Sequence, residues 1–402
     1  MAVPKIKHLR AFTVKGGGGD YHDQAEGHWI DTRIATPMSR WPEYRETRRS
    51  FGLNVLGTLV IEVETDDGTK GFGVTTGGEI GAWIAETHLS RFVEGAAVDD
   101  IATIWDQMFN ASLFYGRRGI VLNVISGIDL ALWDLLGQVR QEPVWHLLGG
   151  KVRDELVFYA TGPRPDLAKE LGFIGGKMPL MHAPCDGDAG LAASIAALGA
   201  MRDKVGPDFW LMLDCWMSLD VDYAERLGRE GATLGLKWIE EPLPPDDYWS
   251  YAALRQRLAG TTWLTTGEHE STRWGFRHLI EMSCCDFIQP DVGWCGGLTE
   301  LVRIADMADA AGMMVIPHGS SVYSYHFVST RENSPFAEFL MMSPRADRIV
   351  PMYDPLLLGE PLPVGGRLKV PDTPGFGVTL NPANTYARPH ARHGDQTGIT
   401  KP

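Results

Sequence analysis

The sequence predicts an α/β protein in which an eight-stranded (β/α) barrel follows an α+β capping domain. Two different sequence patterns, one in each part of the 402 residues, support this fold class. Residues 1–150 begin with strand-like alternation and continue with helical patterns. From residue 151 onward, short apolar runs alternate with amphipathic helical stretches, which are the crossover connections that parallel strands require.

The capping domain is expected at residues 1–150. The stretch "NVLGTLVIEVETDDGTKGFGV" alternates apolar and polar residues around Asp67-Gly68, a pair typical of a hairpin turn. Apolar residues recur at helical spacing in "DDIATIWDQMF" and "VISGIDLALWDLLGQV". Between the first strand and the hairpin lies a long irregular segment, "GGGGDYHDQAEGHWIDTRIATPMSRWPEYRETRRS". Long loops are functional or disordered, and the Trp and His content favours a functional loop.

The barrel is expected at residues 151–352. Helical stretches such as "AGLAASIAALGAMRDKVG" and "LTELVRIADMADAAG" separate its apolar runs. An open doubly wound sheet is the alternative, and the count of eight runs favours the barrel. Residues 353–402 are expected to return to the cap and to end in a mobile tail. The eight runs are "ELVFYATG", "FIGGKMPL", "FWLMLDCW", "LKWIEEP", "TWLTTGEH", "CDFIQPD", "MMVIPHG" and "AEFLMM".

Composition limits the classes of partner. A formal net charge of −14 argues against nucleic acid, because phosphates would repel the chain. The sequence has no N-terminal apolar region of the secretory type and no apolar run of about 18 residues, so no membrane partner is expected. Five cysteines without C-x-x-C spacing indicate reduced packing residues and a cytoplasmic location.

Titratable residues end five successive barrel runs, from the third to the seventh. They follow one another at separations of 23 to 28 residues, about one strand and one helix each. Because the carboxyl ends of barrel strands face one mouth, these side chains should converge on a single cleft. In chain order they are Asp214, Glu240, Glu268, Asp291 and His318.

The residue types indicate acid–base chemistry beside a metal. Asp214, Glu240 and Glu268 would repel one another unless a cation held them, and oxygen ligands favour Mg²⁺ over Zn²⁺. The alternative is that each acid caps the following helix, but Glu is a weak N-cap. Asp291 can orient His318 as a proton acceptor. Mg²⁺ beside such a base suits proton abstraction next to a carboxylate. No H-x-H ends the first run, which disfavours a zinc hydrolase.

The order Asp, Glu, Glu, Asp, His behind an α+β cap resembles the enolase superfamily, mandelate racemase subgroup. Within that subgroup the chain is similar to acid-sugar dehydratases over nearly its whole length. The stretches that carry this resemblance are long and specific, whereas "IEEP" alone would support only the superfamily. They are "GDYHDQ", "RIATPMS", "YATGPRPDLAKELGFIGGKMP", "DFWLMLDCWMS", "QPDVGWCGGLTELV" and "IPHGSSVYS".

The resemblance implies a (β/α)7β barrel and a set of residue roles. Asp214, Glu240 and Glu268 would bind Mg²⁺, and His318 with Asp291 would form the catalytic dyad. Glu338 would be catalytic, opposite the developing negative charge. Substrate-binding residues would be His22, Arg48, Lys177, His269 and Glu338.

The implied reaction is Mg²⁺-dependent dehydration of L-rhamnonate to 2-dehydro-3-deoxy-L-rhamnonate by His-catalysed C2 proton abstraction through a metal-stabilised enediolate. The alternatives are dehydration of L-mannonate or L-lyxonate, and a non-catalytic sugar-acid-binding protein. The resemblance also implies a homo-oligomer, an octamer. Pro179 replaces the second lysine of the racemases' K-x-K pair, which disfavours racemisation and leaves Lys177 as the rival base. Glu270 and Tyr325 stand where histidines would be expected.

Overall fold

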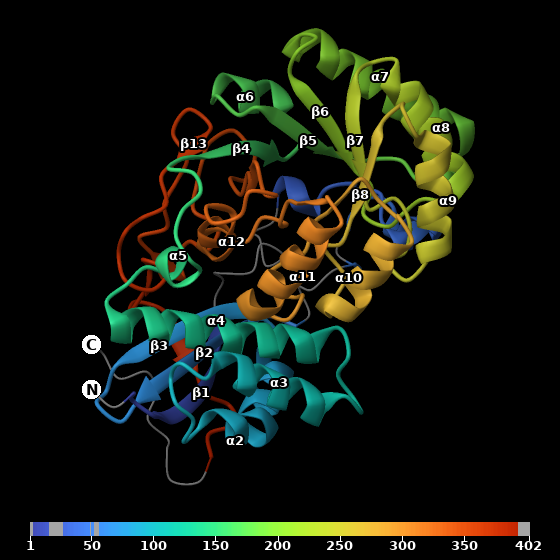
Figure 1. Ribbon diagram of the computed structural model, residues 1–402. Helices are drawn as coiled ribbons and strands as arrows, with labels where there is room; N and C mark the ends of the chain where they lie inside the picture. Colours follow the sequence, from blue (N-terminus) through green and yellow to red (C-terminus); the bar gives the residue numbers. More distant parts are fainter. Residues whose placement is uncertain (1–2, 16–26, 49, 52–55, 393–402) are drawn as a thin grey trace.

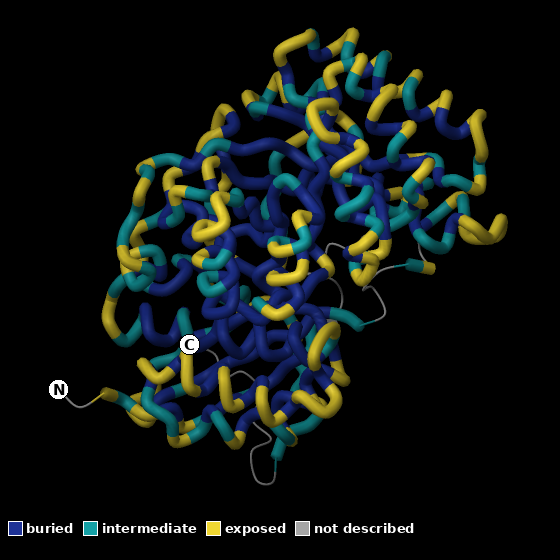
Figure 2. Tube along the Cα trace, turned by 45° about the vertical axis from the view of Figure 1, so that its right-hand side comes forward, coloured by how far each residue is buried: buried dark blue, intermediate teal, exposed yellow. Residues whose placement is uncertain are grey.

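The computed structural model describes residues 3–15, 27–48, 50–51 and 56–392 in two lobes. In Figure 1 the smaller lobe, the cap, lies below the barrel, and helices of the barrel lie against it. Figure 2 shows buried chain running continuously from one lobe into the other. One apolar cluster includes Phe12 and Val74 of the cap together with Leu298 and Tyr323 of the barrel lobe. The two lobes therefore share a core.

The cap sheet is antiparallel, in the order β15-β1-β2-β3. The predicted hairpin joins β2 (Thr58–Thr65) to β3 (Lys70–Thr76), with Gly68 at a positive φ of 88° in the turn. Both predicted helices are present. The remaining cap elements are β1 (Ile6–Lys15), α1 (Gly78–Ile84), η4 (Ala85–Leu89), α2 (Ser90–Val93), α3 (Ile101–Ser112), α4 (Ile120–Arg140) and α5 (Val144–Leu147).

Helix α4 packs directly on strand β3 because glycines let the two backbones approach. A Cβ at Gly73 would lie 2.2 Å from the carbonyl oxygen of Gly127, and one at Gly71 would lie 2.3 Å from the Leu135 nitrogen. By length and composition α4 could cross a membrane, but 89% of its most apolar window is buried inside the protein. It is the core helix of the cap.

Eight parallel strands form the barrel, and the last strand, β11, pairs with the first, β4. Seven helices connect them in sequence order, so the (β/α)7β prediction is confirmed. The strands are β4 (Leu156–Thr161), β5 (Gly175–Pro179), β6 (Trp210–Asp214), β7 (Leu236–Glu240), β8 (Trp263–Thr266), β9 (Phe287–Ile288), β10 (Met314–Val315) and β11 (Ala337–Leu340). The helices are α6 (Pro165–Glu170), α7 (Gly187–Val205), α8 (Val221–Ala232), α9 (Tyr248–Leu258), α10 (Thr272–Glu281), α11 (Leu298–Ala310) and α12 (Val322–Val328), with η5 (Pro184–Asp186) before α7.

A layer of large apolar side chains fills the barrel interior, and we call it the barrel floor. The ring of Trp238 meets Tyr159 at 5.2 Å and Phe287 at 5.3 Å, both edge to face. These arrangements are favourable for aromatic pairs. The floor closes the interior below the carboxyl ends of the strands. Its members are Tyr159, Met212, Trp238, Phe287, Ile316 and Phe336.

The C-terminal segment contacts both lobes. Strand β13 (Arg367–Leu368) pairs with β4 of the barrel, and β15 (Thr385–Ala387) pairs with β1 of the cap. Arg388 forms an ion pair with the buried Glu86. Between these contacts, β12 (Leu357–Leu358) pairs with β14 (Thr379–Leu380). The expected mobile tail falls on residues 393–402, which lie outside the described residues.

Substituting Gly73→Ala should force α4 away from β3 and destabilise the protein. Overpacking of this kind costs about 1–3 kcal/mol in the free energy of unfolding, measurable by denaturant titration. The matched control is Gly199→Ala in α7, where the added Cβ would meet only the Leu234 side chain at 3.7 Å. There the helical preference for Ala should leave stability unchanged or raised by up to ~1 kcal/mol. Equal effects of the two substitutions would contradict the packing argument.

Candidate active site

Three of the predicted polar residues stand on the strands immediately above the barrel floor, whereas Glu268, Asp291 and His318 lie two or three residues beyond the ends of β8, β9 and β10. Side chains on a strand alternate between its two faces, so a residue two positions beyond a floor residue also points inward. Asp214 follows Met212 in this way, Glu240 follows Trp238, and Glu338 follows Phe336. Asp214 and Glu240 are direct neighbours in the β6–β7 register. The fold therefore brings these residues into one layer, at the carboxyl end of the barrel.

A small cavity opens above this layer, under a loop of the cap. The loop between β1 and β2 contains three short 3-10 helices, η1 (Trp29–Asp31), η2 (Pro37–Arg40) and η3 (Pro42–Tyr44). It is anchored to the barrel by a hydrogen bond from the Trp29 indole to the carbonyl of Met341, at 2.8 Å. The cavity is lined by Trp29, Ile30, Thr161, Asp214, Trp216, Glu268, His318, Leu340 and Met342.

The sequence-predicted dyad is assembled in this cavity. His318 Nδ1 lies 2.7 Å from Asp291 Oδ2, and the hydroxyl of Ser320 donates to the same oxygen at 2.8 Å. The Trp294 ring stacks on the imidazole at 5.5 Å. The other ring nitrogen, Nε2, lies 3.4 Å from Glu268 Oε1. One nitrogen is thus held in place by Asp291, while the second faces the cavity beside Glu268.

The environment of His318 favours its protonated form. Burial lowers the pKa of the imidazole, but the charge of Glu268 and the hydrogen bond to Asp291 outweigh burial and raise the pKa to about 10. The carboxylates around the ring therefore stabilise a proton on it. A cation bound near Glu268 would oppose this effect.

Lys177 is fully buried among three carboxylates. Its ammonium lies 2.8 Å from Glu338 and 3.4 Å from Asp214, and it contacts Glu240 directly. Burial lowers the pKa of Lys177, but the charges of Glu240, Glu338 and Asp214 raise it well above its ordinary value. A lysine held in this form has no free pair to accept a proton, so the geometry argues against Lys177 as the rival base.

The two glutamates beside Lys177 have different surroundings. The second oxygen of Glu240 accepts from the Gln289 amide at 2.7 Å and from the Trp238 indole at 3.2 Å. Glu338 accepts from the backbone N–H of Gly319 at 2.8 Å. Burial raises the pKa of Glu338, but the charge of Lys177 outweighs burial and lowers the pKa to about 2. This carboxyl is therefore ionised.

Glu268 also belongs to a second group of possible ligands. Glu241, Glu268 and His269 place one ligand atom each within 4.8 Å of one another, the one such group of three in the described part of the chain. Glu241 Oε2 lies 2.7 Å from His269 Nδ1. Burial lowers the pKa of His269, but the charges of Glu241 and Glu268 raise it to about 9. In this structure Glu241 and His269 therefore form an ion pair.

The buried acids at this end of the barrel suit a divalent cation. Burial and neighbouring negative charge raise the pKa of Asp214 to about 6 and those of Glu240 and Glu268 to about 7. In the described part of the chain, six buried carboxylates form ion pairs with Lys177, His269 and His318. Their all-oxygen donor set fits a hard cation such as Mg²⁺. The six are Asp214, Glu240, Glu241, Glu268, Asp291 and Glu338.

Arg48, a predicted substrate-binding residue, is fully buried, whereas most arginines lie at the surface. Its guanidinium lies 4.3 Å above the ring of Trp216, which lines the cavity. His22, the other predicted cap residue, lies outside the described residues. Sequence reasoning missed Trp29 and Trp216, which line the cavity, and Trp294, which stacks on His318. Two of these tryptophans could have been found from the sequence, because Trp216 and Trp294 follow the predicted site residues Asp214 and Asp291 within three residues.

Family comparisons agree with this architecture. The description "Enolase C-terminal domain-like" matches residues 166–384, and "Mandelate racemase / muconate lactonizing enzyme, N-terminal domain" matches residues 52–149. The chain therefore belongs to the mandelate racemase/muconate lactonizing enzyme family of the enolase superfamily.

Solved structures place the similarity more narrowly. Rhamnonate dehydratase from Gibberella zeae, complexed with Mg, is 47% identical over 95% of both chains, with a TM-score of 0.93. A second structure of L-rhamnonate dehydratase from the same organism is 46% identical over 95% of both chains, with a TM-score of 0.90. The 3,6-anhydro-D-galactonate cycloisomerase from Zobellia galactanivorans is 27% identical over 94% of this chain and 97% of its own, at 0.75. These comparisons confirm the resemblance to acid-sugar dehydratases. The chain is similar to L-rhamnonate dehydratase over 95% of its length.

Replacing Lys177 by Met should strongly destabilise the fold, because it leaves buried carboxylates without their cation. Removing one partner of a buried ion pair costs about 3–5 kcal/mol in the free energy of unfolding. Lys204→Met is the control, since that side chain is 60% exposed and 3.9 Å from Asp166, and its effect should stay within about 0.5 kcal/mol. Denaturant titration without added metal would compare the two variants. A Lys177→Met protein as stable as the control would show that the carboxylates do not depend on the ammonium.

Proposed function

We propose that this enzyme is a Mg²⁺-dependent acid-sugar dehydratase that converts L-rhamnonate into 2-dehydro-3-deoxy-L-rhamnonate and water. The observation that carries the proposal is the His318–Asp291 pair at 2.7 Å, facing Glu268 inside a covered cavity. The 47% identity to a rhamnonate dehydratase supports the choice of substrate.

For the metal we propose the ligands Asp214, Glu240 and Glu268. This set is preferred over Glu241, Glu268 and His269 because it supplies only oxygen ligands, which Mg²⁺ prefers, and because Glu241 and His269 are bonded to each other at 2.7 Å. When bound, Mg²⁺ would act as a Lewis acid that stabilises negative charge on the substrate carboxylate. Lys177 contacts two of these ligands, Asp214 and Glu240, together with Glu338, so its ammonium offsets part of the negative charge of the set.

His318 is the proposed general base and acid. Asp291, which accepts a hydrogen bond from Ser320, fixes the ring through Nδ1. A cation at Glu268 would oppose protonation of the ring, so that Nε2 can take the proton from C2 of the sugar acid. The same nitrogen then returns this proton to the departing C3 hydroxyl, which leaves as water. The enol that remains converts to the 2-keto acid. Lys177 is held in ion pairs with three carboxylates, and Pro179 stands where a second lysine would be, which favours dehydration over racemisation.

The remaining predicted residues bind substrate in this proposal. Arg48, held against Trp216 at the cavity, and His22 would contact the sugar hydroxyls from the cap. His269 follows Glu268 in the chain and would also contact the substrate. Glu338 would need a proton to donate a hydrogen bond to developing negative charge, and its contact with Lys177 keeps it ionised. A donor role for Glu338 therefore requires that this contact break.

Glu270 and Tyr325, which stand where histidines would be expected, are not among the residues that line the cavity. Glu270 bonds to the Tyr248 hydroxyl and to Arg118, and Tyr325 packs edge to face on Phe158 at 5.1 Å. Their replacement of histidine thus removes nothing from the cavity walls. L-mannonate and L-lyxonate are the competing substrates. We also propose a cytoplasmic homo-oligomer, an octamer, which light scattering on the purified protein would test.

The substrate proposal predicts 2-keto acid formation from L-rhamnonate at a higher kcat/KM than from L-mannonate or L-lyxonate. Semicarbazide trapping of the 2-keto acid measures the rate for each sugar. A chelator should abolish the reaction, and Mg²⁺ should restore it, because the buried carboxylates need a cation. Turnover that survives metal removal would overturn the metal assignment, and inactivity with all three acids would overturn the substrate class.

The dyad assignment predicts that His318→Asn retains Mg²⁺ and substrate binding while losing dehydration and C2 proton exchange. Asp291→Asn keeps the ring but weakens its basicity, so its loss should be smaller; general-base contributions are about 10²- to 10⁴-fold. NMR in deuterated water follows exchange at C2, and calorimetry follows binding. Exchange at near wild-type rate in His318→Asn would make another group the base.

A further inference from the structure

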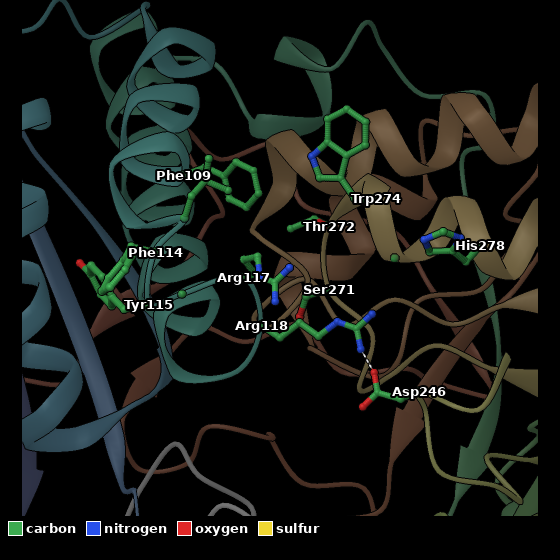
Figure 3. A pocket seen from close by; sticks show the side chains of 13 residues that line it. Phe109, Phe114, Tyr115, Arg117, Arg118, Asp246, Ser271, Thr272, Trp274 and His278 are labelled. Carbon is green, nitrogen blue, oxygen red and sulfur yellow. Dashed lines mark hydrogen bonds and ion pairs between the residues drawn. The ribbon is translucent and has the colours of Figure 1, made fainter.

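A cleft of about 800 Å³ separates the cap from the outer side of α10, away from the cavity described above. Figure 3 shows Arg118 crossing this cleft to Asp246, with Ser271 and Thr272 beside it. Arg118 belongs to the cap loop between α3 and α4, whereas Asp246 belongs to the loop after β7. The contact therefore joins the two lobes next to the loop that follows β8.

Arg118 reaches beyond Asp246 to a carboxylate that is almost completely buried. Its Nη2 lies 3.2 Å from Glu270 Oε2, and it also contacts the Tyr248 hydroxyl, which donates to the same oxygen of Glu270. The other oxygen of Glu270 accepts from the Ser271 backbone N–H at 2.7 Å. Glu270 is only 1% exposed, so Arg118 supplies its cationic partner.

Glu270 is the last residue of the turn that presents Glu268. Its backbone N–H donates to the carbonyl of Gly267 at 3.1 Å, which makes Glu268 and His269 the two central residues of the turn. The fold makes room for the Glu270 side chain, since a Cβ on Gly275 would lie 2.1 Å from its Oε1. Holding the Glu270 side chain thus fixes one end of a four-residue turn.

We infer that Arg118 and Glu270 are positioning residues that set the orientation of Glu268 from the cap side. This inference rests on the proposed function, in which Glu268 binds Mg²⁺. Neither residue lines the cavity, so both act through the turn. Groups that orient metal ligands typically change metal affinity by about 10- to 100-fold when they are removed. The protein should therefore bind Mg²⁺ more tightly when Arg118 joins the cap to Glu270 than when this contact is lost.

The test is calorimetric titration of the full chain with MgCl₂ in the absence of substrate. Arg118→Gln and Glu270→Gln should each weaken Mg²⁺ binding about 10-fold or more. The double variant should be no weaker than the worse single variant, because both changes break one contact. Arg117→Gln is the matched control: Arg117 is exposed and lines the same cleft, and its variant should bind Mg²⁺ within about two-fold of wild type.

Kinetics at saturating Mg²⁺ separate positioning from chemistry. There the kcat of Arg118→Gln should return close to the wild-type value, since the reacting groups are intact. Unchanged Mg²⁺ affinity in a folded Arg118→Gln protein, or additive losses in the double variant, would overturn the inference. Glu268→Gln in the same titration tests the ligand itself. Wild-type protein that does not bind Mg²⁺, or Glu268→Gln that binds it normally, would instead overturn the proposed metal site.

Discussion

The alternation of side chains along the barrel strands is the constraint on which the site depends. A floor residue points into the barrel, the next residue points outward into the helical layer, and the one after that points inward again. Trp238 and Glu240 illustrate the result, since the indole of the first donates to the carboxylate of the second. The apolar floor blocks the barrel below, so the acids above it can be reached only from the mouth. If a barrel strand shifted its register by one residue, the residues that now point outward would point into the barrel, and the acids would point outward.

Crowding like charges in such a place costs free energy, and the surrounding contacts show how the fold offsets it. Lys177 neutralises part of the charge, the backbone N–H of Gly319 donates to Glu338, and an amide and an indole donate to Glu240. Trp29 and Ile30 exclude water above, which strengthens every electrostatic interaction below them. Burial, together with neighbouring negative charge, still raises the pKa of Asp214 and of Glu268. A buried site of this kind is ready for a cation and an anionic substrate together.

Much of this architecture could be predicted from local patterns. The eight runs identified the strands, and the regular spacing of acids at their ends identified one face of the barrel. The His318–Asp291 contact followed because neighbouring strand ends must be close. Contacts between distant segments could not be predicted in this way. Nothing near Lys177 in the sequence reveals that three carboxylates surround it, and the stacking of Arg48 on Trp216 joins a cap loop to the loop after β6. The pairing of Glu241 with His269 depends on how two strand-end loops bend after β7 and β8.

The antiparallel pairing of β15 with β1 makes the cap a product of both ends of the chain. Thr13 and Ala387 contact each other although they are 374 residues apart. A ribosome releases the first strand long before the last one exists, so the cap sheet lacks this strand during nearly all of synthesis. The barrel, whose neighbouring strands lie close in sequence, can assemble first. The lobe that begins the chain is therefore completed last, after the scaffold on which it closes.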